Sequence, residues 1–144
     1  MEIVCSTDSK YIMPTGIMLT SLFESNRGEV VNVHLLHDQD SAVLLDSIRT
    51  IAARYQQNIH FYLINDDIFK HFPIGLDFQV DHVGTSFATY YRLYLTEILP
   101  ADIDKVIYLD GDILVVDKLV KLWNTSVENY AIAAVPDSYN NKIE

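Results

Sequence analysis

Two aspartates separated by one glycine are the residues of this sequence best suited to chemistry. Asp110, Gly111 and Asp112 directly follow a strand expected at residues 105–109. In an extended backbone, residues two apart project to the same side, so the two carboxylates would converge on one point. Like charges at that range repel, and a hard divalent cation with oxygen ligands removes the repulsion. The spacing therefore suggests a metal site, with Gly111 leaving room for a bulky ligand beside the backbone.

The same three residues also fit an ordinary Asp-Gly turn between two strands. Solidly apolar runs on both sides, residues 106–109 and 113–116, argue against a two-residue hairpin turn. From these residues alone, the metal site and the turn remain equally good interpretations.

Asp8 is a second candidate, because it lies just past the apolar residues 3–5, where a turn would expose it. The simplest interpretation is a turn or helix-capping aspartate. A carboxylate at this position could also accept hydrogen bonds from a base edge or a ribose hydroxyl. Tyr11 is near enough in the chain to stack on that base.

Arg92 is a third candidate, on a helix expected over residues 86–99 with Thr85 or Ser86 as its cap. Its apolar neighbours at helical spacing place it at the edge of the packed face. A partly buried guanidinium needs an anionic partner. That partner is either a ligand or an acid of this chain in a structural salt bridge, and both interpretations stay open.

Other titratable residues are weaker candidates. His34 and His37 are three apart on an expected strand, so they face opposite sides and cannot share a metal. Cys5 is the only cysteine and lies in an apolar run, which indicates a small core residue. We interpret the acid pairs 66–67 and 102–104 as solvated turns.

The elements that must position these residues alternate along the chain. Apolar runs predict strands at residues 3–5, 30–36, 59–64, 105–109 and 131–135, and helical spacing predicts helices at 12–26, after Ser41, and at 86–99. Gly28 is expected to close the first helix, and residues 71–84 to form a long loop. This order predicts an α/β fold with a mostly parallel sheet, whose ligands bind beyond the carboxyl ends of the strands. Polar residues follow three of those ends, at Thr7-Asp8, Asp110-Gly111-Asp112 and Asp137.

Composition restricts the class of protein. The chain has 144 residues, 49% hydrophobic, with 10 basic and 20 acidic side chains and a net charge of −10. It has the length of one domain, and its acidity disfavours nucleic acid as a partner. No apolar run approaches the ~20 residues of a membrane span, and no basic region precedes the first strand. We therefore expect no signal peptide, no transmembrane segment and a cytoplasmic location.

Missing motifs exclude several reactions. The sequence contains no dinucleotide-binding fingerprint, no phosphate-binding loop with its lysine, no nucleophile elbow and no cysteine–histidine zinc set. Hydride transfer with that fingerprint, P-loop hydrolysis and acyl transfer by such an elbow are excluded accordingly.

Three segments together resemble family-8 glycosyltransferases, which include bacterial lipopolysaccharide galactosyl- and glucosyltransferases and glycogenin. They are residues 3–8 (IVCSTD), 88–93 (ATYYRL) and 104–115 (DKVIYLDGDILV), and residues 122–123 and 133–137 also fit. The resemblance spans nearly the whole chain in the same order and with similar spacing. The combination is specific, although the D-x-D pattern alone is not.

The resemblance implies the GT-A fold, a Rossmann-like, mostly parallel sheet flanked by helices. Residues 1–144 would be the nucleotide-sugar-binding part of one catalytic domain, incomplete at its C-terminus. The implied reaction is metal-dependent, retaining transfer of galactose or glucose from UDP-galactose or UDP-glucose. The implied acceptor is a hydroxyl of lipopolysaccharide or another cell-surface glycan, which suggests a location peripheral to the inner face of the membrane.

The resemblance also assigns roles to single residues. It implies Mn²⁺ or Mg²⁺ binding by Asp110 and Asp112 on the diphosphate, with Gly111 between them, and catalytic roles for Arg92 and Asp137 beside the donor sugar. The nucleoside would be bound by the loop after the first strand, through Ser6, Thr7, Asp8 and Tyr11.

Two departures from the family pattern matter. Lys10 stands where some relatives carry a nucleotide-binding asparagine, and the chain stops at Glu144 whereas family members continue. The continuation would supply a metal-binding histidine and most of the acceptor site. A catalytically silent nucleotide-sugar-binding fragment is therefore the alternative to an enzyme, and a purely structural domain is a third hypothesis. A sheet edge left open would favour self-association.

Overall fold

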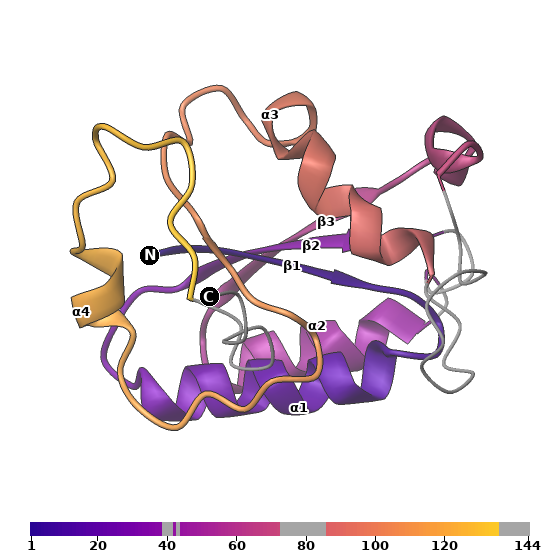
Figure 1. Cartoon of the computed structure of the whole chain (residues 1–144). Helices are drawn as coiled ribbons and strands as arrows, with labels where there is room; N and C mark the ends of the chain where they lie inside the picture. The colour runs from indigo at the N-terminus through magenta and orange to yellow at the C-terminus, as the bar shows by residue number, and fades with distance from the viewer. Residues whose placement is uncertain (39–41, 43, 73–85, 136–144) are drawn as a thin grey trace, which may run out of the picture.

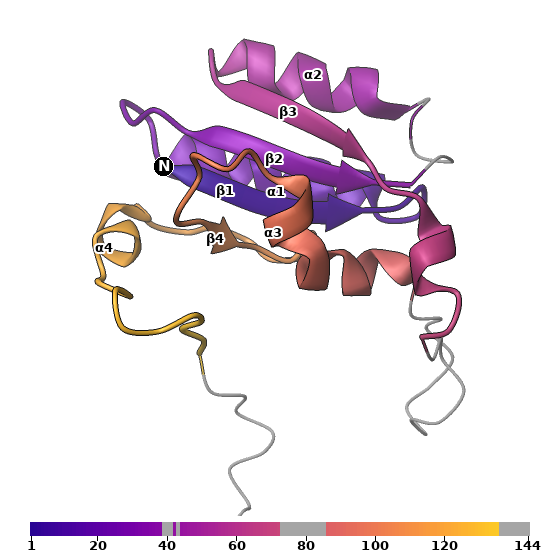
Figure 2. The ribbon, with the colours of Figure 1, turned by 90° about the horizontal axis from the view of Figure 1, so that it is seen from above.

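The computed structural model describes residues 1–38, 42, 44–72 and 86–135, and Figure 1 shows their arrangement. Within these residues the centre is a four-stranded, wholly parallel sheet in the order β3-β2-β1-β4, seen from above in Figure 2. The strands are β1 (Glu2–Thr7), β2 (Asn32–His37), β3 (Asn58–Leu63) and β4 (Ile107–Tyr108). Strands alternate with helical segments, as expected when crossovers join parallel strands. The predicted α/β class is confirmed.

The helical segments differ in length and type. The α-helices are α1 (Ile12–Ser25), α2 (Leu45–Arg54), α3 (Leu95–Ile98) and α4 (Val120–Trp123), and the 3₁₀-helices are η2 (Asp66–Phe69) and η3 (Phe87–Tyr94). Beyond the end of α1, Gly28 has a φ of 87°, a left-handed conformation that glycine adopts without strain.

Helices α1 and α2 cover one face of the sheet, below it in Figure 1. Alternate residues of β1 point to opposite faces, so Ile3 and Cys5 enter this core while Val4 enters the other. Met18 of α1 and Ile48 of α2 are buried in the same cluster. The buried stripe of α1 packs against the sheet, and the amino end of the helix lies near the end of β1 because it follows that strand after a short turn.

The opposite face is covered by η3 and α3, above the sheet in Figure 1, while η2 lies beyond the carboxyl end of β3 and packs against η3 (Figure 2). The core on this face is aromatic, with Phe69 of η2 and Tyr91 of η3 fully buried against Val4 and Leu36. The Tyr91 hydroxyl donates a hydrogen bond to the Asp66 carboxylate. Burial and this bond raise the pKa of Tyr91. Asp66 is half-buried and hydrogen-bonded, so the prediction of a solvated turn is wrong for this residue, whereas Asp67 is exposed. The contact joins η3 to η2.

Three predicted elements differ from the structure. The helix expected over residues 86–99 is a 3₁₀-helix followed by one α-helical turn, and the strand expected at 105–109 is reduced to Ile107–Tyr108. The strand expected at 131–135 is wrong, since these residues are exposed and form no strand. An apolar run becomes a strand only where a neighbouring strand pairs with it, and no described residue does so here. Ser41 and nearly all of the expected loop 71–84 lie outside the described residues.

Candidate functional site

The predicted site residues of the described part of the chain meet at the carboxyl ends of β1 and β4. These strands are parallel neighbours, with Val4 opposite Tyr108, so the segments after them emerge side by side. They border a pocket of about 290 Å³, which residues of η3 line on the side above the sheet. Its lining residues are Ser6, Thr7, Asp8, Tyr11, Ser86, Ala88, Thr89, Arg92, Asp110, Gly111 and Asp112. The roles of these residues in binding stay predictions, and Asp137 lies outside the described residues.

The segment after β1 is a tight turn built around the Asp8 carboxylate. Its Oδ1 accepts hydrogen bonds from the backbone N–H groups of Lys10 and Tyr11, each at 2.9 Å. This is the turn aspartate that the sequence favoured. Asp8 is only 7% exposed, so the expectation that the turn exposes it is wrong, but the residue lines the pocket. One carboxylate oxygen holds the turn, and no described residue donates a hydrogen bond to the other. Tyr11 is 37% exposed beside it.

Buried hydroxyls join this turn to the acidic motif. Thr15 of α1 is fully buried and donates to the Thr7 hydroxyl at 3.1 Å, and Thr7 donates to the Asp8 carbonyl at 3.2 Å. A Cβ on Gly111 would lie 2.6 Å from the Thr15 Oγ1. The structure thus gives a packing reason for this glycine, because any side chain would push the acidic motif away from α1. Room for a ligand beside Gly111 stays a prediction.

Arg92 lies between η3 and the acidic motif. Its Nη2 donates to the Asp110 Oδ1 at 2.6 Å, and its Nε donates to the Thr89 carbonyl at 3.1 Å. The guanidinium carbon lies 4.4 Å from the centre of the Tyr108 ring. The anionic partner of Arg92 is therefore Asp110, an acid of the predicted metal motif. Arg92 forms a salt bridge within the chain, as one interpretation expected, and this salt bridge lies at the candidate site.

Tyr108 continues this chain of contacts to β1. Its hydroxyl lies 2.6 Å from the Ser6 hydroxyl, and one hydrogen bond joins them. Burial raises the pKa of the Tyr108 phenol, against the opposing effects of the Ser6 hydrogen bond and the Arg92 charge. The phenol is therefore neutral at pH 7, so the ring presents a neutral aromatic face to the arginine.

Asp110 and Asp112 offer a divalent cation the right kind of donor atom but too few of them. Residues 110–113 form a turn, closed by a hydrogen bond from the Ile113 N–H to the Asp110 carbonyl at 3.4 Å, so the extended backbone assumed for this motif is wrong. Both carboxylates are nevertheless exposed and line the pocket. Within the described residues, no group of three or more His, Cys, Asp or Glu side chains could hold a metal ion. Hard oxygen donors suit Mg²⁺ or Mn²⁺, which commonly keep waters and take substrate phosphates as further ligands. The donor set fits a cation that binds together with a phosphate-containing ligand.

Sequence reasoning missed Thr15, Tyr108, Ser86 and Thr89. Thr15 could have been found as a polar residue on the buried face of α1, and Tyr108 as a polar ring in a buried strand next to the acidic motif. No signal marked Ser86 or Thr89 as lining residues, because their position depends on how η3 docks.

Residues judged to be structural behave as expected. Cys5 is fully buried, and burial raises the pKa of its thiol to about 12, so it is not a nucleophile. His34 and His37 lie on opposite faces of β2 and have different partners. The ring of His34 is hydrogen-bonded to Glu2 and Tyr62, and the ring of His37 to the Asp38 carbonyl. Among the described residues, none of the helices has the length and apolar character that crossing a membrane requires.

Comparison with solved structures finds the same fold. The chain superposes on the crystal structure of galactosyltransferase LgtC in complex with donor and acceptor sugar analogues, with a TM-score of 0.71 and 32% identity. The match covers 88% of this chain and 43% of LgtC. The parallel sheet flanked by helices is that of a GT-A glycosyltransferase, which confirms the predicted fold.

Curated relatives agree with this result. The chain is 27% identical over 135 residues to a lipopolysaccharide 1,2-glucosyltransferase of Escherichia coli K12, covering 94% of this chain and 38% of the relative. It is 26% identical over 138 residues to glycosyltransferase GlyF of Streptococcus pneumoniae, covering 96% and 32% respectively. The chain thus spans less than half the length of these relatives.

The family model described as glycosyl transferase family 8 matches residues 2–144, nearly the whole chain. Because this match extends over nearly all of its residues, the chain belongs to glycosyl transferase family 8.

Proposed function

We propose that this chain is the donor-binding part of a metal-dependent, retaining glycosyltransferase that moves galactose or glucose from a UDP-sugar to an acceptor hydroxyl. The observation that carries the proposal is that one pocket is bordered both by Asp8 and by Asp110 and Asp112. One extended ligand, with a base at one end and a diphosphate at the other, matches that distribution of groups.

Each residue of the pocket would contact a different part of the ligand. The free Asp8 oxygen would accept a hydrogen bond from the uracil, and Tyr11 would pack on the base, with Ser6 and Thr7 near the ribose. Asp110 and Asp112 would hold Mn²⁺ or Mg²⁺, which, when bound, supplies Lewis-acid stabilisation of the departing diphosphate. Arg92 would contribute a second positive charge beside the phosphates and keep Asp110 oriented.

The finer parts of the proposal come from the family resemblance and the relatives' names. The lipopolysaccharide glucosyltransferases among the relatives support a glycan or lipopolysaccharide acceptor and a location at the inner face of the membrane. Exposed apolar side chains such as Ile113, Leu114 and Val116 support self-association. A concentration-independent monomer in size-exclusion chromatography would contradict that last part.

Calorimetric titration of UDP tests the donor site. We expect binding with Mn²⁺ that is lost in EDTA and in both Asp110→Ala and Asp112→Ala. Asp102→Ala removes an exposed acid away from the pocket and serves as the matched control, with unchanged affinity. Equal UDP affinity with and without metal would contradict the proposal.

Turnover separates the enzyme from the silent binding module. UDP release from UDP-galactose or UDP-glucose, measured on this chain and on any longer gene product, supports the transferase. Metal-dependent UDP binding without release in either protein supports the silent module instead.

A further inference from the structure

We propose that Tyr108 is a positioning residue of the donor site, whose ring, anchored by Ser6, holds Arg92 in the orientation that pairs it with Asp110. The proposal rests on the proposed function, because it takes Asp110 as a ligand of the donor site. Tyr108 itself is absent from the pocket lining, so it acts through Arg92 and not on the ligand.

The contacts form one continuous path between two strands and η3. The Ser6 and Tyr108 hydroxyls lie 2.6 Å apart, and the Arg92 guanidinium lies 4.4 Å from the centre of the Tyr108 ring. Arg92 then donates to Asp110 at 2.6 Å. Each contact is short enough to be direct, so movement of the ring would move the guanidinium with it.

Exposure explains why the arginine needs this support. The side chains of Arg92 and Asp110 are 40% and 53% exposed, and an ion pair this open to water is too weak to hold a long side chain alone. The ring below the guanidinium and the Thr89 carbonyl at Nε restrict it from two further directions. Restricting rotamers before the ligand arrives removes an entropic cost from binding.

The Ser6 hydrogen bond supplies the rigidity of the ring. Tyr108 is the last residue of the two-residue strand β4, which pairs with β1 on one side within the described residues. A side-chain bond from the end of β4 to β1 therefore adds a constraint where the backbone ladder is short. It also connects the turn after β1 to the acidic motif, the two halves of the pocket.

Epistasis with Arg92 is the decisive test. With Mn²⁺ present, Tyr108→Leu is expected to weaken UDP binding about fivefold, and Tyr108→Phe, which keeps the ring, about twofold. In an Arg92→Ala background, Tyr108→Leu should change UDP affinity no further. Tyr94→Leu removes a half-buried ring that packs on Phe69 and controls for a general loss of stability. The same loss from Tyr108→Leu in both backgrounds would overturn the proposal.

The Ser6–Tyr108 hydrogen bond is tested separately. The variants for this test are conservative, so the test remains possible if Tyr108→Leu does not fold. Ser6→Ala and Tyr108→Phe should not add, because each removes the same hydrogen bond. Additive losses in the double variant would overturn the anchoring role.

A readout without metal or nucleotide distinguishes failure of this proposal from failure of the proposed function. In NMR spectra of the free protein, the Arg92 Hδ protons should be shifted upfield by the Tyr108 ring. The shift should persist in Tyr108→Phe and disappear in Tyr108→Leu. Absence of UDP binding in the wild type together with this shift would refute the proposed function alone, whereas an unshifted wild-type signal would refute the positioning role.

Discussion

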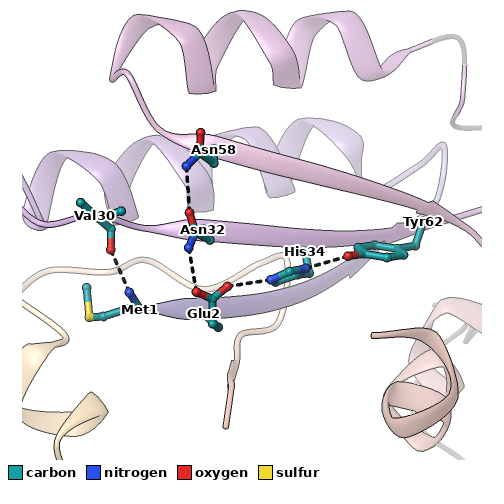
Figure 3. A network of polar contacts seen from close by, with 7 residues as sticks. All are labelled: Met1, Glu2, Val30, Asn32, His34, Asn58 and Tyr62. Atoms are coloured by element: carbon teal, nitrogen blue, oxygen red, sulfur yellow. Dashed lines mark hydrogen bonds and ion pairs between the residues drawn. The ribbon is translucent and has the colours of Figure 1, made fainter. Parts of the chain in front are cut away.

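Two polar clusters lie on the same sheet and differ in how their hydrogen bonds are used. One begins at the amino ends of the strands, on the face opposite α1 and α2, and is drawn in Figure 3. The other is the pocket at the carboxyl ends of β1 and β4. Both combine acidic, aromatic and uncharged polar side chains, so composition alone does not tell them apart.

In the amino-end cluster, the side chains are bonded to one another. The Glu2 carboxylate accepts from Asn32 at 2.7 Å and lies 2.8 Å from the Nε2 of His34, whose Nδ1 lies 2.9 Å from the Tyr62 hydroxyl. Asn58 donates to Asn32 at 2.9 Å and extends the hydrogen-bond network to β3 (Figure 3). His34 is 3% exposed. Such a cluster stabilises the sheet and leaves little for a ligand to bind.

In the pocket, by contrast, hydrogen bonds hold the side chains in place but leave some of their polar atoms without a partner among the described residues. One oxygen of Asp8 holds its turn, Arg92 occupies one oxygen of Asp110, and Asp112 is exposed. Polar groups that neighbours orient, and that keep hydrogen-bonding atoms facing a pocket, are typical of binding sites. The comparison teaches that unsatisfied hydrogen-bonding capacity, and not polarity, distinguishes the candidate site from structural clusters on the same sheet.

The largest expected effect comes from removing one charge in the pocket. Asp112→Asn keeps the shape of the side chain and should weaken UDP binding in Mn²⁺ about 100-fold, since it removes one of two carboxylates that would hold the cation. Thermal unfolding should change little, because the side chain is exposed. Calorimetry measures UDP affinity and thermal melts measure stability. If Asp112→Asn lowered stability without weakening UDP binding, the pocket would behave like the structural cluster and the comparison would be contradicted.

The reciprocal change belongs to the amino-end cluster. His34→Ala should lower the free energy of unfolding by about 2 kcal/mol, because it leaves a cavity and deprives Glu2 and Tyr62 of a partner. Its UDP affinity should match the wild type. His60→Ala, which removes the exposed ring stacked on His34, is the matched control and should cost well under half as much in urea unfolding.

A third change tests whether the pocket is preorganised by packing. Gly111→Ala should lower the free energy of unfolding by about 1.5 kcal/mol and weaken UDP binding, because the new methyl group meets the Thr15 hydroxyl. Adding Thr15→Ala removes that atom and should restore part of the affinity. Failure of the double variant to improve on Gly111→Ala would show that Thr15 is not the obstacle.

The smallest effect is a pH dependence confined to the amino-end cluster. Burial opposes ionisation of Glu2, but hydrogen bonds from Asn32 and His34, with the nearby charges of His34 and the amino terminus, hold its pKa below the ordinary value of 4.5. A lowered folded-state pKa adds stability that is complete above the unfolded value and is lost as the pH falls below it. The stability difference between wild type and Glu2→Gln should therefore shrink as acid is added from pH 6 to about pH 3 in urea titrations. A constant difference would contradict the shift.

Local patterns predicted much of the fold and part of the site. The apolar runs of β1, β2 and β3 and the helical spacing of α1 predicted elements close to those observed, because burial of strands and amphipathic helices leaves a local signature. The prediction of a strand at residues 131–135 is wrong because strand formation also requires a pairing strand elsewhere in the chain. Asp8 and the acidic motif were predicted to meet because parallel strands end at one edge of a sheet.

From the sequence alone, the residue types of the site, their position after strands and the family resemblance could be determined, since these depend on order along the chain. Only the tertiary structure decided that Arg92 pairs with Asp110, that Thr15 meets Gly111, and that Tyr108 bonds to Ser6, 102 residues away. Those contacts depend on how η3, α1 and β4 dock, and docking is set by the summed packing of many side chains rather than by any local pattern.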